Sequence, residues 1–108
     1  MLNIWILGLC LNLITGYFFE HSESFPPKVY TVEIKGMEFL PAQIKVKKGD
    51  TIVWINKDIV VHTVTEEKRK AWTSSLIPIG KSWKMVVKES SLYYCTLHPV
   101  MKGQIQVQ

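Results

Sequence analysis

The sequence predicts an all-β fold, an antiparallel β-sandwich made of many short strands. From Lys28 onward, apolar side chains alternate with polar ones at a period of two, which is the pattern of half-buried strands. Glycine, proline, asparagine and aspartate separate these runs at short intervals. No window of ten or more residues in this region keeps the helical period of 3.6. Short strands at this spacing are typical of a two-layer sandwich.

The expected strands follow one another along the chain. They cover residues 30–34, 44–46, 52–55, 60–64, 92–95 and 105–107. Turn chemistry lies between them at Gly36, Pro41, 48–50, 56–58, 78–80 and 89–91. Residues 65–75 leave room for a short helical turn. We expect Gly103 to let the chain turn into the last strand, and the large aromatic side chains to form the core.

The N-terminal part of the chain differs from the rest. Met1 to Phe19 contains no charged side chain and is mostly apolar, which favours a secretory signal segment that is removed. A retained membrane anchor is the alternative, because 19 residues of helix reach just under ~30 Å. Residues 1–24 are thus expected to be a signal or anchor plus linker, and residues 25–108 the folded domain. Cys10 is interpreted as part of the apolar run.

The charge of the domain is positive. Thirteen Lys and Arg face nine Asp and Glu, and removing Glu20 and Glu23 with the leader leaves +6. Such a charge favours partners with acidic docking surfaces. The lysines are scattered, with only Lys68-Arg69-Lys70 and Lys47-Lys48 adjacent, so the sequence does not indicate a nucleic-acid-binding protein.

One short segment contains three side chains that can bind a metal ion. Cys95-Thr96-Leu97-His98-Pro99-Val100-Met101 places a thiol, an imidazole and a thioether at three-residue intervals, and His62 can supply a fourth ligand. Two imidazoles, one thiolate and a weak axial thioether are the ligand set of a blue-copper centre. Zinc is the main competitor, but a thioether is a poor zinc ligand. Met37 is assigned to the core or the surroundings of the site.

The cysteine count supports a metal independently. Within residues 25–108, Cys95 is the only cysteine, so an exported, periplasmic domain has no internal disulfide. Coordination to a metal deprotonates the thiol and holds it, which explains a solitary cysteine in an oxidising compartment.

These residues together point to a family. From Val29 to Val107 the chain resembles the cupredoxins, and specifically the plastocyanin and amicyanin group. The resemblance rests on Gly36 to Pro41, Val46 to Asn56, His62-Thr63-Val64 and Cys95 to Gly103. It implies a Greek-key β-sandwich with one copper ion held by His62, Cys95, His98 and Met101. It also implies that His98 lies near the surface inside an apolar patch through which electrons pass.

Three positions depart from the family pattern. Thr63 stands where Asn is common, and its hydroxyl is expected to reach Thr96. Leu97 stands where proline is common, and we expect its N–H to point at the thiolate and raise the reduction potential. The lead-in to the cysteine is shortened to Ser91-Leu92-Tyr93-Tyr94.

The leading functional hypothesis is a small monomeric electron carrier that serves larger redox proteins and is not an enzyme. The alternative is an exported copper chaperone or storage protein, for which exposed and exchangeable ligands would be needed. Copper oxidases and nitrite reductases need further histidine-rich centres, whereas this chain has three histidines. One of them, His21, lies in the leader or linker and is interpreted as a bystander.

Overall fold

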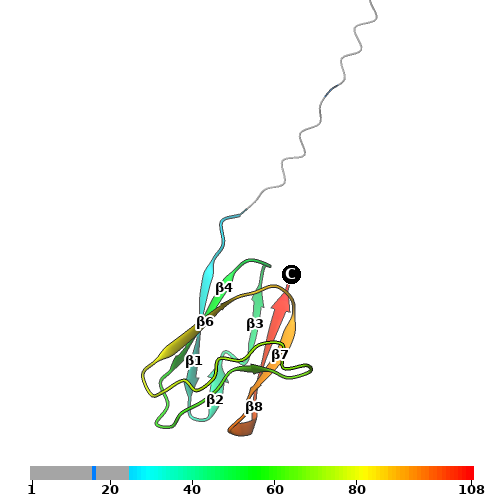
Figure 1. Ribbon diagram of the computed structural model, residues 1–108. Helices are drawn as coiled ribbons and strands as arrows, with labels where there is room; N and C mark the ends of the chain where they lie inside the picture. The colour runs from blue at the N-terminus through cyan, green and yellow to red at the C-terminus, as the bar shows by residue number, and fades with distance from the viewer. Residues whose placement is uncertain (1–15, 17–24) are drawn as a thin grey trace, which may run out of the picture.

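The computed structural model describes Gly16 and residues 25–108, and the described part of the chain is a sandwich of two four-stranded sheets (Figure 1). The all-β prediction is confirmed. The strands are β1 (Val29–Lys35), β2 (Glu38–Leu40), β3 (Gln43–Val46), β4 (Thr51–Asn56), β5 (Thr65–Glu66), β6 (Ser82–Val86), β7 (Ser91–Cys95) and β8 (His98–Val107).

The expected signal or anchor segment falls outside the described residues, and the division at residues 24 and 25 stays a prediction. Within the part of the chain that is described, no helix has the length and apolar character needed to span a membrane.

The strand directions correct one prediction, since both sheets are mixed rather than antiparallel. The sheet orders are β2-β1-β4-β6 and β3-β8-β7-β5. β1 pairs in parallel with β4, and β3 in parallel with β8. The chain leaves the first sheet at β3 and returns to it at β4, so β4 runs in the same direction as β1. A period of two in the sequence specifies which face is buried, but not the direction of the neighbouring strand.

The core lies between the two sheets and confirms the assignment of the aromatic residues. Trp54 and Tyr93 are fully buried, one from each sheet, and their rings meet edge to face with centroids 5.5 Å apart. Trp83 stacks at a tilt on Trp54, also with centroids 5.5 Å apart. The ring of Phe39 also meets the ring of Tyr93 edge to face, with centroids 4.8 Å apart. These contacts fix the distance between the sheets and therefore the position of β7.

The β7–β8 hairpin is tighter than predicted. The strands expected at residues 92–95 and 105–107 place His98 in the connection between them and Gly103 at a turn. Instead β8 begins at His98, which pairs with Cys95 across the two-residue turn Thr96-Leu97. Gly103 lies within β8 opposite Tyr93, where a Cβ atom would overlap the tyrosine ring. The glycine therefore makes space for the core rather than a turn.

Two further segments differ from the prediction. His62 does not lie on a strand but forms an isolated bridge with Ile77. Residues 65–75 contain β5 and a turn in place of a helical turn, because the Glu66 carboxylate accepts the backbone N–H groups of Arg69 and Ala71. These backbone groups are thereby satisfied without a helix.

Candidate metal centre

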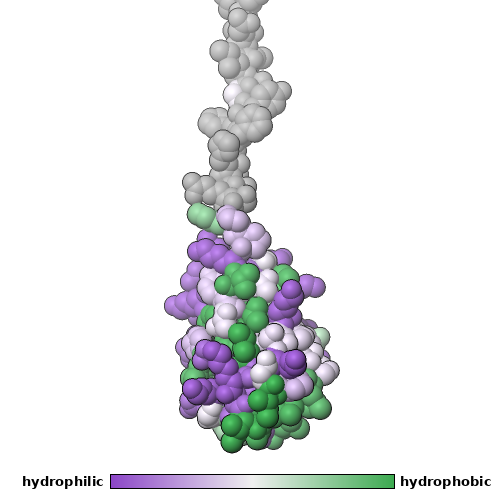
Figure 2. Space-filling view, turned by 90° about the vertical axis from the view of Figure 1, so that its left-hand side faces the viewer, coloured by the Kyte–Doolittle hydropathy of each residue, from purple (hydrophilic) through white to green (hydrophobic). Residues whose placement is uncertain are grey.

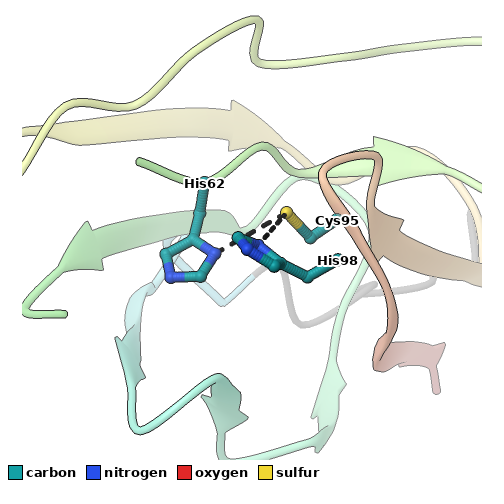
Figure 3. Close-up of side chains that lie close together, drawn as sticks. All are labelled: His62, Cys95 and His98. Carbon is teal, nitrogen blue, oxygen red and sulfur yellow. Dashed lines mark hydrogen bonds between the residues drawn. The ribbon is translucent and has the colours of Figure 1, made fainter. Parts of the chain in front are cut away.

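The structure brings His62, Cys95 and His98 together beside the turn that joins β7 to β8 (Figure 3). Cys95 ends β7 and His98 begins β8, so the hairpin turn sets their separation. His62 comes from a different segment, which the bridge to Ile77 holds in place. The Cys95 sulfur lies 3.6 Å from Nδ1 of His62 and 3.7 Å from Nδ1 of His98. Three candidate donors from two separate parts of the chain thus face one another.

These separations suit a single small metal ion. For bonds of about 2.0 Å to nitrogen and about 2.3 Å to sulfur, two donors about 120° apart lie roughly 3.7 Å from each other. The observed separations of 3.6 and 3.7 Å are close to this value. His62 and Cys95 are fully buried, and His98 is partly buried. Such burial favours retention of the ion over exchange with solvent.

Met101, the fourth predicted ligand, is buried in β8 with 2% of its surface exposed. It follows His98 by three residues on the same strand. Its role as an axial ligand stays a prediction. Met37, which was assigned to the core or the surroundings of the site, is 39% exposed at the tip of the β1–β2 turn and so does not belong to the core.

Asp58 is a residue of the site that sequence reasoning missed. Its Oδ2 lies 2.9 Å from Nε2 of His62, on the side of the ring away from Cys95. The carboxylate also accepts the backbone N–H groups of Met37 and Ile59. The N–H groups of Met37 and Ile59, followed by the His62 ring, hold the pKa of Asp58 below its ordinary value. Asp58 is therefore ionised at neutral pH, although only 9% of it is exposed.

Thr63 connects the two ligand-bearing segments, as predicted. Its backbone N–H donates to the Cys95 sulfur at 3.3 Å. Its hydroxyl oxygen accepts the Thr96 N–H at 2.8 Å and lies 2.9 Å from the Thr96 hydroxyl. The hydrogen bond expected from the Leu97 N–H to this sulfur is not among those found in residues 25–108. The backbone donor to the sulfur is Thr63 instead.

The surface around the site is apolar. Leu97 and Val100, on either side of His98 in sequence, are 50% and 90% exposed, and Ile59 is 85% exposed. Figure 2 shows hydrophobic side chains gathered over the lower end of the domain. Single exposed apolar side chains are ordinary, but apolar side chains that gather into one patch mark an interaction surface.

A family model describing copper-binding proteins of the plastocyanin/azurin family matches residues 28–108. The chain belongs to this family. The family's cofactor is copper, and the sulfur and nitrogen donors gathered here fit it. The copper prediction and the resemblance stated from the sequence are thereby confirmed.

Individual relatives agree with this assignment. Amicyanin from Paracoccus versutus is 26% identical over 89 residues, which cover 77% of this chain and 67% of the relative. The solved structure of an amicyanin variant in its reduced state has a TM-score of 0.69 and 27% identity, covering 74% of this chain and 82% of the other. This cupredoxin also resembles a copper-containing nitrite reductase from Thermus scotoductus, with a TM-score of 0.69 and 20% identity, over 24% of that chain. That last likeness shows a shared fold only.

Proposed function

We propose that this cupredoxin is a type 1 copper protein that carries single electrons between larger redox proteins, with His62, Cys95, His98 and Met101 as ligands. The observation that carries the proposal is the convergence of Cys95 with two histidine Nδ1 atoms at 3.6 and 3.7 Å. Copper, when bound, supplies a one-electron couple between Cu(II) and Cu(I). The protein's part is to keep the donors in nearly the same place in both states.

The surroundings of the donors meet this requirement. Cys95 is held by the N–H of Thr63, and Thr63 is tied to Thr96 across the hairpin turn. His62 is held by Asp58. Because Cys95 and His62 each have a fixed neighbour, little rearrangement of these two donors is needed when the charge of the site changes by one, which lowers the barrier to transfer.

Electrons enter and leave, in this proposal, through the edge of His98. It is the partly buried member of the donor set, and the exposed Leu97 and Val100 flank it. An apolar patch lets a partner approach closely, and the positive charge of residues 25–108 steers partners with acidic surfaces toward the domain. The domain acts as a monomer between encounters.

The same site argues against catalysis. Copper oxidases and nitrite reductases need further histidine-rich centres, whereas His62 and His98 are the two histidines of residues 25–108 and both belong to this site. We also propose an exported, periplasmic location. Cys95 is the free cysteine of the described residues, and export leaves it in an oxidising compartment where coordination would protect it.

The proposal is tested by repeated redox cycling of the copper-loaded protein. Ascorbate and ferricyanide reduce and reoxidise the protein many times in the presence of a strong Cu(I) chelator. An electron carrier returns to its starting absorbance after each cycle and keeps its copper. A copper chaperone or storage protein yields its copper to the chelator in the reduced state, and this result would contradict the proposal.

A further inference from the structure

The proposed function uses the Asp58–His62 contact only to hold the ring in place, but the same contact also bears on the protonation of the ring. The His62 ring is fully buried, and its two nitrogens face opposite partners. Nδ1 faces the Cys95 sulfur at 3.6 Å, while Nε2 faces Oδ2 of Asp58 at 2.9 Å. An ionised carboxylate only accepts hydrogen bonds, so the proton of a neutral His62 ring lies on Nε2. Nδ1 is then left with a free lone pair directed at the sulfur.

Asp58 is itself fixed from three directions. Its Oδ1 accepts the N–H of Ile59 at 2.9 Å, and its Oδ2 also accepts the N–H of Met37 at 3.0 Å. Its own N–H donates to Oδ1 of Asn56 at 2.9 Å. Met37 presents its N–H from a turn in which both Gly36 and Met37 have positive φ, at 60° and 61°. The carboxylate therefore cannot follow the ring if the ring rotates.

Building on the proposed function, we propose that Asp58 is a positioning residue for copper. It selects the tautomer of His62 that presents Nδ1 to the metal, and its negative charge makes the imidazole a stronger donor toward Cu(II) than toward Cu(I). A carboxylate that accepts the second ring N–H raises the basicity of a ligating histidine.

The two histidines differ in this respect. His98 has its Nδ1 near the sulfur, and no carboxylate contacts its ring in residues 25–108. His62 is thus the anchored ligand and His98 the ligand that faces the surface. The two histidines thus have different tasks. His62 sets the affinity of the site for copper, and His98 serves electron exchange.

The matched control is Asp50, a second buried carboxylate that is 4% exposed. It accepts the backbone N–H groups of Lys28 and Lys47, both at 2.9 Å, but its hydrogen bonds reach no histidine. Asp58→Asn and Asp50→Asn remove the same charge and disturb comparable backbone contacts. Any general effect of losing a buried carboxylate should therefore appear in both variants.

The first experiment uses the metal-free protein. Long-range proton–nitrogen correlation NMR of the full chain, labelled with ¹⁵N-histidine, reports which ring nitrogen carries the proton. We expect His62 to carry it on Nε2, with slow exchange, in the wild type and in Asp50→Asn. Asp58→Asn should give a mixture of tautomers. A wild-type ring protonated on Nδ1 would overturn the proposal, and this result is available even if Asp58→Asn fails to fold.

The second experiment uses the copper-loaded protein. Asp58→Asn should bind Cu(II) about 10- to 100-fold more weakly than the wild type, with a smaller loss for Cu(I). A tenfold difference between the two losses corresponds to a rise of about 59 mV in the reduction potential. Asp50→Asn should leave the potential unchanged. Equal shifts in both variants, or no shift in Asp58→Asn, would overturn the proposal.

The failure of this inference is distinguishable from the failure of the proposed function. If the wild-type protein gives no thiolate-to-copper absorption, the electron-transfer function fails, while the tautomer of His62 can still be measured. If the wild type shows that absorption and Asp58→Asn keeps its potential, the role of Asp58 alone is excluded.

Discussion

Thr63 performs two tasks with two different groups. Its backbone N–H contacts the sulfur of Cys95, and its hydroxyl is the acceptor for the N–H of Thr96. A hydrogen bond to a thiolate withdraws electron density from it and stabilises the reduced metal. The hydroxyl contact keeps the hairpin turn at a fixed distance from the segment that carries His62. A threonine therefore replaces the asparagine that is common at this position by pairing with a second threonine.

Replacing Thr63 with valine should weaken this tie. The Thr96 N–H loses its acceptor, so we expect a loss of about 1 kcal/mol in the free energy of unfolding, measured by urea unfolding. The copper absorption band should also shift or broaden, because the turn between Cys95 and His98 is less constrained.

The control for this substitution is Thr65→Val. Thr65 is buried, and its hydroxyl pairs with that of Thr73 at 2.9 Å, a hydrogen bond that does not include a residue of the donor set. It should lose a similar stability without changing the copper spectrum. An unchanged spectrum in Thr63→Val, or the same change in both variants, would contradict the assignment.

At the scale of elements, the β7–β8 hairpin links the core to the metal site. Tyr93 in β7 packs against Trp54 and Phe39, and burial raises the pKa of Tyr93 to about 12. Gly103 in β8 makes room for the ring. Two residues further along β7 is Cys95. The contacts of Tyr93 in the core therefore fix the position of the Cys95 sulfur.

Gly103→Ala should destabilise the protein by more than about 3 kcal/mol, since the added methyl group overlaps the Tyr93 ring and the packed core yields little. Gly80→Ala is the control. Gly80 has open space around it and a φ of +77°, so an alanine there meets no neighbouring atom. Its left-handed backbone conformation alone should lower the free energy of unfolding by about 1 kcal/mol. Equal losses for the two variants in thermal or urea unfolding would show that Gly103 is not needed for the ring.

At the scale of the whole molecule, we expect two copies to exchange electrons through the apolar patch formed by Leu97, Val100 and Ile59. Val100→Lys places like charges on both faces of the encounter and should slow electron self-exchange roughly tenfold or more. Val86→Lys is the control, because Val86 is also exposed but pairs with Thr51 at the start of β4. Line broadening in NMR of mixed Cu(I) and Cu(II) samples measures the rate. Similar slowing in both variants would exclude the patch as the contact surface.

Stability of the metal-free protein should fall on acidification. The N–H groups of Lys28 and Lys47 hold the pKa of Asp50 below its ordinary value, and those of Arg69 and Ala71 do the same for Glu66. A lowered pKa in the folded state gives stability that is complete above the unfolded pKa of about 4 and is lost as the pH falls below it.

Urea unfolding between pH 7 and pH 3 measures this loss. Asp50→Asn should be less stable than the wild type at pH 7 and should show a shallower fall toward pH 3. A wild-type stability that stays constant or rises on acidification would contradict the role of these carboxylates.

Most of the donor set could be predicted from the sequence, because three of its residues are close together along the chain. Cys95, His98 and Met101 lie within seven residues, and His62 is the one other histidine in residues 25–108. The contact between Asp58 and His62 could not be predicted, because it depends on the conformation of residues 56–61. The parallel pairing of β1 with β4 was equally hidden, since alternation identifies faces and not directions. The role of Gly103 became visible only when Tyr93 was placed opposite to it.

The central claim is that one copper ion binds between the sulfur and the two imidazoles. The most direct test is a Cu(II) titration of the metal-free protein, followed by visible absorption and compared with Cys95→Ser. We predict an intense band in the red that saturates at one equivalent of copper and is missing from Cys95→Ser. A folded wild-type protein that binds no copper, or that gives the same spectrum as Cys95→Ser, would contradict the claim.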